Sequence, residues 1–382
     1  MPENADLYLP SCPGLYIHVP FCRKKCRYCT FYSVPSLDAI PDYIEALSRE
    51  MALYCGSFDS FDTVYLGGGT PSVLSVNAVE EILTNIRKHF NVMPNSEITL
   101  EGNPQDLDMP MLTSLRDLGV NRLNIGVQSF SEDILSFLGR RHTADTARRA
   151  LDNARRAGFT NIGIDLMYGI PGQDIRQWLA TLDEALYHGP EHLSCYELTV
   201  ETTTPLGKQL ESGTISLPDE GLQAEFFIKT SELLESSGYV HYEISNFAKD
   251  LTLLSRHNLK YWNHTPYLGL GPAAHSFIRN RRWWNHPSIS RYIDDLGQGT
   301  PPVEAAEHLT PDELKLEALY LGLRTRFGID LAEFTTAYGE DILSEKKDFI
   351  ARLVDEGLVV VDRGRLLPTR RGMAVADALS LI

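Results

Sequence analysis

The chain has 382 residues, of which 43% are hydrophobic and 23% charged, as is typical of a soluble globular protein. Its formal net charge of −16 argues against generic nucleic-acid binding, which depends on neutralising phosphates. It has no run of eighteen apolar residues and no signal-peptide pattern over residues 1–6, so we expect at most peripheral membrane contact. Clustered cysteines in such a chain favour a metal site in a reducing compartment, and we expect a cytoplasmic protein.

Short apolar runs alternate with longer amphipathic ones, which predicts a series of βα units. The predicted strands are Leu15–Val19, Thr63–Leu66, Glu97–Glu101, Arg122–Val127, Asn161–Leu166 and His192–Leu198. The predicted helices are Ala39–Tyr54, Ala78–His89, Pro110–Leu118, Ala144–Ala157, Asp174–Tyr187 and Glu220–Ser236. Six successive units predict a parallel sheet with right-handed crossovers. The expected fold class is therefore α/β, with a partial (β/α)6 barrel.

Three cysteines follow the first predicted strand, at Cys22, Cys26 and Cys29 in the spacing C-x-x-x-C-x-x-C. A structural zinc site and an iron–sulfur cube each need four ligands. Three thiolates on a four-iron cluster leave one iron open to a small molecule. The alternative, three unrelated cysteines of which one packs in a core, is disfavoured by this spacing in a chain with only six cysteines. The other three stand apart and are interpreted as ordinary small apolar residues.

Polar or glycine-rich residues also lie at or near the carboxyl ends of the other five predicted strands. They are the run Gly67-Gly68-Gly69-Thr70-Pro71, then Glu101, Gln128, Asp165 and Thr199. In barrels of this kind function gathers at the carboxyl ends of the strands, and glycines let backbone amides approach a ligand closely. Each signal alone has an ordinary structural explanation, such as a turn or a locally satisfied polar group. Together they predict a rim that binds one polar ligand.

The cysteine run, with the aromatic Tyr28 before its third cysteine, resembles the signature of the radical S-adenosylmethionine (SAM) enzymes. The resemblance implies a 4Fe-4S cluster on Cys22, Cys26 and Cys29, with the amino and carboxylate groups of SAM on the open iron. In that family the reduced cluster cleaves the sulfonium to give a deoxyadenosyl radical, so the cofactor carries the difficult chemistry. It also implies an electron donor such as flavodoxin or ferredoxin.

Four further segments, ITLEGNP, GVQSF, LGRRH and IDLMYGIPGQ, resemble the coproporphyrinogen-oxidase-like branch of that superfamily. The resemblance assigns to SAM binding Tyr16, Tyr28, Gly68, Gly69, Thr70, Glu101, Gln128, Arg140, Asp165 and Thr199. The chemistry is reasonable, because Asp165 can accept hydrogen bonds from ribose hydroxyls and Arg140 can offer a planar fork to a carboxylate.

One position departs from the oxidases of this branch, which carry a further cysteine where this chain has Phe31. The departure resembles the HemW-type haem chaperones, and so does the segment His257-Asn-Leu-Lys-Tyr261-Trp262, which matches H-N-x-x-Y-W. Histidine is a common haem-iron ligand, and aromatic rings can pack on a porphyrin. A histidine in an aromatic segment is otherwise usually a core residue. With the family resemblance, haem contact by His257 is favoured.

A group of basic and aromatic residues follows this motif. It can offer charge to haem propionates and apolar cover to the porphyrin ring, and its members are Arg279, Arg281, Arg282, Trp283 and Trp284.

After Pro301-Pro302 the pattern changes to a winged-helix-like α+β module. It comprises predicted helices at Glu313–Thr325, Asp330–Tyr338 and Ser344–Glu356 and strands at Leu358–Asp362 and Arg365–Pro368. Such modules often bind DNA, but the acidic composition favours a protein-contact or lid domain. We therefore divide the chain into a barrel over 1–240, an extension with the H-N-x-x-Y-W motif over 241–302, and this domain over 303–382.

Two functions of different class follow from the resemblance. The first is a haem chaperone that passes haem to an acceptor haemoprotein, with the cluster and SAM in a regulatory or transfer role; Phe31 and the His257 motif support it. The second is an oxygen-independent coproporphyrinogen III oxidase, which decarboxylates propionates through the deoxyadenosyl radical; the intact rim supports it. We favour the chaperone and assign no catalytic residue.

Overall fold

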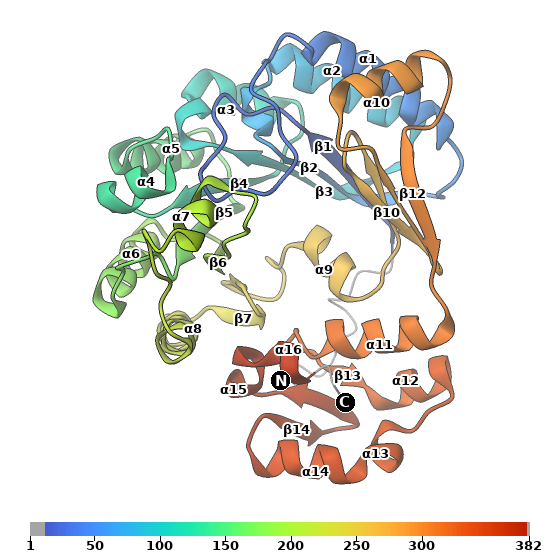
Figure 1. The fold of residues 1–382 in the computed structure, drawn as a ribbon. Helices are drawn as coiled ribbons and strands as arrows, with labels where there is room; N and C mark the ends of the chain where they lie inside the picture. Colours follow the sequence, from blue (N-terminus) through green and yellow to red (C-terminus); the bar gives the residue numbers. More distant parts are fainter. Residues whose placement is uncertain (1–11, 380–382) are drawn as a thin grey trace.

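The structure, a computed structural model, describes residues 12–379; residues 1–6, for which no signal peptide is expected, lie outside this range. Its main feature is a curved twelve-stranded sheet with helices on the convex face (Figure 1). The strand order is β12-β11-β10-β9-β1-β2-β3-β4-β5-β6-β8-β7. The strands are β1 (Gly14–Val19), β2 (Phe61–Gly68), β3 (Val92–Gly102), β4 (Arg122–Gln128), β5 (Ile162–Tyr168), β6 (His192–Glu197), β7 (Val240–Glu243), β8 (Asn246–Ala248), β9 (Tyr267–Leu270), β10 (His275–Ile278), β11 (Arg281–Asn285) and β12 (Val303–His308).

Strands β1 to β6 are parallel neighbours joined through helices, so the predicted α/β class with a partial barrel of six βα units is confirmed. The helices of this part are α1 (Ile40–Leu53), α2 (Val76–His89), α3 (Met109–Asp117), α4 (Glu132–Leu138), α5 (Ala144–Arg156), α6 (Ile175–His188), α7 (Pro205–Glu211), α8 (Glu220–Ser236), α9 (Arg256–Trp262) and α10 (Ile289–Gly297). Short 3-10 turns follow β2 at Pro71–Val73 and β3 at Pro104–Asp106. Among residues 12–379, no helix combines the length and apolar composition needed to cross a membrane.

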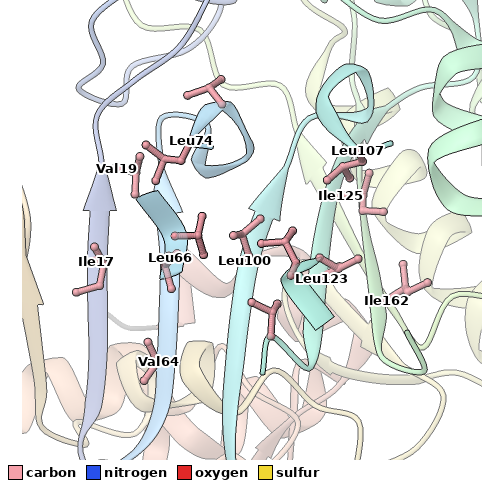
Figure 2. Close-up of a cluster of buried hydrophobic side chains, with 14 of the residues drawn as sticks. Ile17, Val19, Val64, Leu66, Leu74, Leu100, Leu107, Leu123, Ile125 and Ile162 are labelled. Carbon is pink, nitrogen blue, oxygen red and sulfur yellow. The ribbon is translucent and has the colours of Figure 1, made fainter. Parts of the chain in front are cut away.

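Alternate residues of the central strands face the helices or the interior of the curve. In β1, Ile17 is buried in the core beneath the helices, whereas Tyr16 and His18 point to the opposite, concave face. Figure 2 shows how Ile17, Leu66 and Leu100 from three adjacent strands form one layer of this core. Each such fully buried side chain contributes roughly 1.5–3 kcal/mol to stability, so this layer fixes the strands whose concave residues form the site.

Residues 240–308 lengthen the sheet at both edges. β8 and β7 add to β6 in antiparallel fashion, and β9 adds in parallel to β1. β10, β11 and β12 follow β9 as antiparallel strands. One sheet therefore runs through the segments predicted as barrel and extension and also includes β12, and the division at residues 240 and 302 stays a prediction.

The last part of the chain forms a second, smaller domain. It has its own hydrophobic core, which includes Leu323, Ile350 and Leu366. Its antiparallel sheet has the order β13-β15-β14. The elements are α11 (Pro311–Gly322), β13 (Ile329–Asp330), α12 (Leu331–Tyr338), α13 (Ile342–Glu345), α14 (Lys347–Asp355), β14 (Val359–Asp362), β15 (Arg365–Pro368), α15 (Arg370–Ala374) and α16 (Ala376–Leu379). The predicted α+β character of this C-terminal domain is confirmed.

The C-terminal domain contacts the large sheet near both of its edges (Figure 1). At one edge the backbone N–H of Arg326 donates to the carbonyl of Tyr242 in β7 at 3.0 Å. Near the other, Glu317 of α11 accepts two hydrogen bonds from Arg282 of β11, at 2.9 and 2.6 Å. Both bonds come from one guanidinium nitrogen, and hydrogen bonds between charged groups are roughly twice as strong as neutral ones. The domain therefore joins the two ends of an otherwise open sheet.

A buried carboxyl group, Glu50 of α1, connects the barrel to the extension. It accepts hydrogen bonds from the Gly271 N–H at 2.8 Å and from the Tyr292 hydroxyl at 2.6 Å. Its other oxygen accepts from the side-chain amide of Asn285 at 2.6 Å. Burial raises the pKa of Glu50 from 4.5 to about 7, although these three donors favour the ionised form. Glu50 therefore fixes the turn after β9. In the folded protein the Glu50 carboxyl keeps its proton to a higher pH than in the unfolded chain.

The raised pKa of Glu50 predicts a pH-dependent stability. Between about pH 4.5 and 7 the folded protein holds a proton that the unfolded chain has lost, so the free energy of unfolding falls as pH rises through this window. Glu50→Gln mimics the neutral form. Between about pH 4.5 and 7 its free energy of unfolding, measured by urea denaturation, should fall by up to roughly 3 kcal/mol less than that of the original chain. The exposed Glu45→Gln on the same helix serves as control and should titrate like the original chain. An identical pH profile for Glu50→Gln would contradict this account.

Candidate functional site

The cysteine loop leaves the carboxyl end of β1 and is attached to the barrel at three points. At its base the backbone N–H of Cys22 donates to the carbonyl of Val34 at 3.0 Å. In its middle the N–H of Arg27 donates to Leu138 at the end of α4 at 3.2 Å, and the carbonyl of Arg27 accepts from Leu206 in α7 at 3.1 Å. The loop is therefore held over the rim by backbone bonds that do not depend on the cysteines.

Tyr28 fastens the same loop through its side chain. Its ring packs on a cluster of buried residues comprising Ile134, Leu138, Met167, Ile170, Leu198 and Leu206. Its hydroxyl is hydrogen-bonded to the guanidinium of Arg140, and burial raises its pKa well above the usual range. In this position the Tyr28 ring forms a wall of the site next to the cysteines.

The three predicted cluster cysteines are free thiols, each partly buried. The sulfur of Cys22 lies 3.0 Å from the hydroxyl of Thr70, and that of Cys26 accepts from the Arg140 guanidinium at 3.4 Å. Burial raises the pKa of the Cys29 thiol, and the neighbouring Cys26 and Cys22 raise it further. The three sulfurs therefore share one neighbourhood on the loop.

Within the described range, no group of three or more His, Cys, Asp or Glu side chains is placed to hold a single metal ion. A four-iron cube is larger than one ion and separates its ligands more widely. Three thiols on one loop, with a hydroxyl and a guanidinium beside them, form a donor set that suits a cube with one open iron better than a closed four-ligand zinc site.

The predicted glycine run lies so close to β1 and its loop that side chains would not fit. Gly68 has φ +104, and a Cβ there would lie 2.5 Å from the His18 ring. A Cβ at Gly69 would lie 2.8 Å from the backbone carbonyls of Val19 and Phe21. The Gly69 N–H donates to Val19 at 2.9 Å. The loops after β1 and β2 are thereby joined backbone to backbone.

Glu101, at the end of β3, faces the concave interior and is partly exposed. One oxygen accepts from the Tyr65 hydroxyl at 2.7 Å, and the other accepts from the Gly68 N–H at 3.1 Å. Burial raises its pKa to about 7; the Tyr65 hydrogen bond opposes this, and the nearby Asp165 adds to it. A carboxyl group of this kind ionises readily when a cation binds beside it.

Asp165 lies in the middle of β5 and also faces the interior. Both of its oxygens accept from the side-chain amide of Asn124 in β4, at 2.9 and 2.8 Å, and Ser194 of β6 donates a further bond. Burial raises its pKa, while these hydrogen bonds favour the ionised form. The neighbouring strands therefore hold Asp165 in one orientation and leave it acceptor capacity toward the interior.

Arg140 and Gln128 show two signs of a prepared binding site. Arg140 donates to the carbonyl of Gly126 at 2.5 Å, while its buried Nε has no hydrogen-bond partner within the described residues. Gln128 has φ +69, next to an irregularity in the β4–β5 register at Gly126. A left-handed backbone at a non-glycine residue and an unpaired buried N–H each cost about 1–3 kcal/mol. Such costs are typical of sites completed by a ligand.

The remaining predicted SAM residues, Tyr16, Thr70 and Thr199, lie in three separate parts of the site region. Tyr16 faces the interior, with its hydroxyl 3.1 Å from Nδ1 of His18, and burial raises its pKa well above the usual range. Thr70 is beside Cys22, as described above. Thr199 is exposed, two residues beyond the end of β6.

His257 lies at the amino end of the barrel, opposite the cysteine loop. Its Nδ1 is 2.8 Å from the Thr63 hydroxyl and its Nε2 is 2.8 Å from the Tyr261 hydroxyl. Its ring stacks on Tyr65 with centroids 5.0 Å apart. Burial lowers its pKa to about 3, so the ring is neutral. In this structure His257 connects α9 to β2 beneath the site.

The basic and aromatic group at residues 279–284 is divided between the two faces of β11. The Arg281 guanidinium lies 4.9 Å from the Trp283 ring, which stacks on Tyr54, directly after α1, at the convex face. Trp284 and Arg282 face the concave side by strand alternation. Two of the five residues predicted to face haem therefore lie on the concave face and two on the convex face, while Arg279 lies in the turn between β10 and β11.

Three interior residues were not predicted from the sequence: Tyr65, Asn124 and His18. All three lie within apolar strands at positions that alternate with buried aliphatic residues. That alternation was the available signal, because a polar residue on the concave face of a barrel strand must satisfy its hydrogen bonds with other interior groups.

Two segments match family models: residues 16–185 match the Radical SAM superfamily, and residues 309–375 match the HemN C-terminal domain. The chain is 35% identical to the heme chaperone HemW of Mycobacterium tuberculosis (strain H37Rv) over 97% of this chain and 95% of that protein. It is 34% identical to the heme chaperone HemW of Bacillus subtilis over 95% of this chain and 96% of that protein.

A solved structure, coproporphyrinogen III oxidase (HemN) from Escherichia coli, has a similar fold. The TM-score is 0.84 at 24% identity, over 97% of this chain and 90% of that one. This likeness concerns the fold alone.

The close contact at Gly68 predicts the effect of adding one methyl group. Gly68→Ala should lower the free energy of unfolding by about 1–3 kcal/mol more than Gly299→Ala, because the new Cβ meets the His18 ring. Gly299 is a matched control, since it also has positive φ (+73) but nothing within 4 Å of its Cβ position. Urea denaturation of both variants measures the difference, and equal losses would show that the carboxyl ends of β1 and β2 are not in close contact at Gly68.

Proposed function

We propose that this chain, which belongs to the HemW family of radical SAM proteins, binds haem and passes it to an acceptor haemoprotein. The observation that carries the proposal is its 35% and 34% identity to two proteins named heme chaperone, over 97% and 95% of the chain. Phe31 supports it, because the oxidase pattern has a cysteine at this position and the side chain here is instead 66% exposed.

The radical SAM family implies a 4Fe-4S cluster and SAM, and we infer that Cys22, Cys26 and Cys29 hold the cluster. When bound, such a cluster supplies an electron for SAM cleavage. The fit is supported by Arg140, whose guanidinium donates to the Cys26 sulfur and can offset the negative charge of thiolates. The three attachment points of the loop keep the thiols over the rim.

We assign the concave interior beside this loop to SAM. The carboxyl groups of Glu101 and Asp165 suit a ligand with a cationic amino group and ribose hydroxyls, and the unpaired Nε of Arg140 suits its carboxylate. The remaining residues that we predict to contact SAM are Tyr16, Tyr28, Gly68, Gly69, Thr70, Gln128 and Thr199.

The proposed cluster and SAM site also imply an electron donor. Arg23, Lys24 and Lys25 on the cysteine loop are consecutive exposed cations in an acidic chain. Charge complementarity supports docking of an acidic electron donor such as flavodoxin or ferredoxin at this face. We also propose a reducing compartment such as the cytoplasm, where thiolate ligands persist, and a protein-contact role for the C-terminal domain.

The alternative function is oxidation of coproporphyrinogen III. It is supported by the polar residues assembled at the rim, whereas the likeness to HemN concerns the fold alone. The two functions differ in outcome, because a chaperone releases haem unchanged whereas an oxidase releases carbon dioxide over many turnovers.

The chaperone proposal predicts directed transfer. The cluster-reconstituted protein should bind about one haemin per chain under anaerobic conditions, seen as a saturating Soret band. Transfer to the apo form of a candidate acceptor haemoprotein from the same cell should accelerate with acceptor concentration, whereas loss of haem to apomyoglobin, which only scavenges released haem, should not. Absence of saturable haemin binding, together with multiple-turnover carbon dioxide release from coproporphyrinogen III, would replace the chaperone by the oxidase.

The SAM assignment predicts a specific loss of affinity. Asp165→Ala should weaken SAM binding by about 1–3 kcal/mol through lost hydrogen bonds to a charged acceptor. Anaerobic calorimetry on the reconstituted protein measures this, with the exposed Asp133→Ala of α4 as the control that should bind normally. If Asp165→Ala binds SAM as tightly as the control, Asp165 does not belong to the site.

A further inference from the structure

The histidine of the H-N-x-x-Y-W motif is enclosed in the structure. His257 is 1% exposed, and contacts with the Thr63 and Tyr261 hydroxyls engage both of its ring nitrogens. Ligation of haem iron needs a ring nitrogen with an available lone pair that faces the ligand. His257 has no such nitrogen in this arrangement, which leaves the other histidines as candidate ligands.

All eleven histidines lie within the described residues, and two of them are exposed: His275 in β10 and His308 in β12. They face opposite sides of the sheet. His308 is paired in register with Arg281, which lies with Trp283 on the convex face. His275 is paired with Trp284, which lies on the concave face.

The surroundings of His275 hold its ring and leave its nitrogens accessible. The ring stacks on Trp284 with centroids 5.6 Å apart and an interplanar angle of 22°. A stacked neighbour covers a face of the imidazole but not its edge, which carries both nitrogens. Across residues 12–379, neither nitrogen of His275 has a hydrogen-bond partner. Trp284 therefore acts as a positioning residue for an unengaged imidazole.

The concave face next to His275 is aromatic. Phe277, two residues further along β10, lies 6.2 Å from the Tyr267 ring of β9. The end of α9 covers this lower part of the face, since Tyr261 meets Tyr267 at 4.7 Å. α9 thus closes the amino end of the face, and His275 stays open on the side toward the cysteine loop.

His275 is also near that loop. The ring of His18 contacts the carbonyl of Tyr32 at 2.9 Å, and His275 is close enough to His18 for its charge to act on it. Phe31, directly before Tyr32, is exposed. The imidazole of His275 therefore lies between the end of the cysteine loop and the aromatic rings of Phe277 and Tyr267, which suits a flat apolar ligand with a central metal ion.

We propose that His275 is the axial ligand through which this protein holds its haem. One ring nitrogen donates its lone pair to the iron, and no bond of the porphyrin is made or broken, so the haem can leave intact. The inference rests on the proposed chaperone function and assigns its cargo site. It gives His257 a structural role in the attachment of α9.

The test is an anaerobic haemin titration of four versions of the full-length, cluster-reconstituted protein, followed by Soret absorbance and electron paramagnetic resonance of the ferric haem. These are the original chain, His275→Ala, His275→Gly and the control His308→Ala. We expect His275→Ala to weaken haemin binding at least about tenfold and to change the spin state of the iron. His308→Ala should match the original chain. Added imidazole should restore the original spectrum in His275→Gly, which a merely structural role would not produce.

The outcomes separate this inference from the proposed function. If the original chain binds no haemin, the chaperone function itself fails. If it binds haemin and the affinity and spectrum of His275→Ala are unchanged, the chaperone function stands and His275 is not the ligand. A loss of the spectrum in a folded His257→Gln variant, with His275→Ala unaffected, would return the ligand to the H-N-x-x-Y-W motif.

Discussion

The close approach of the loops after β1 and β2 is the constraint on which the site depends. Gly68 and Gly69 pass so near to His18 and to the backbone of the cysteine loop that only glycine fits. This contact places the cysteine loop, the Gly68 amide and the Glu101 carboxylate side by side. Because parallel strands bring their carboxyl ends to one rim, the chemistry of six strands then meets in one place.

The interior of the open sheet imposes the second constraint, because its polar groups are desolvated. Glu101 and Asp165 have raised pKa values through burial, and Tyr65 and Asn124 satisfy part of their hydrogen-bonding capacity. Holding such groups costs stability unless a ligand of opposite charge completes them. α9 closes the amino end of this interior and the C-terminal domain joins the two edges of the sheet, so the groups are held in place before any ligand binds.

The order of the barrel strands could be predicted because each apolar run is followed by an amphipathic helix, a pattern that leaves few topologies. The rim residues could be predicted from their positions at the carboxyl ends of strands, as Glu101 near the end of β3 shows. Asn124 was missed, because its role follows from its hydrogen bonds to Asp165, and these depend on the register between β4 and β5. Nor could the sequence show that His257 would be enclosed beneath the barrel, since this depends on where α9 packs against β2.

The central claim is that three thiolates of one loop hold a four-iron cluster whose remaining iron faces the rim. The most direct test is electron paramagnetic resonance of the reduced, reconstituted protein before and after SAM is added. Our account predicts a 4Fe-4S signal whose g values shift on SAM binding, because the amino and carboxylate groups of SAM reach the open iron. A cluster signal that SAM leaves unchanged would contradict it.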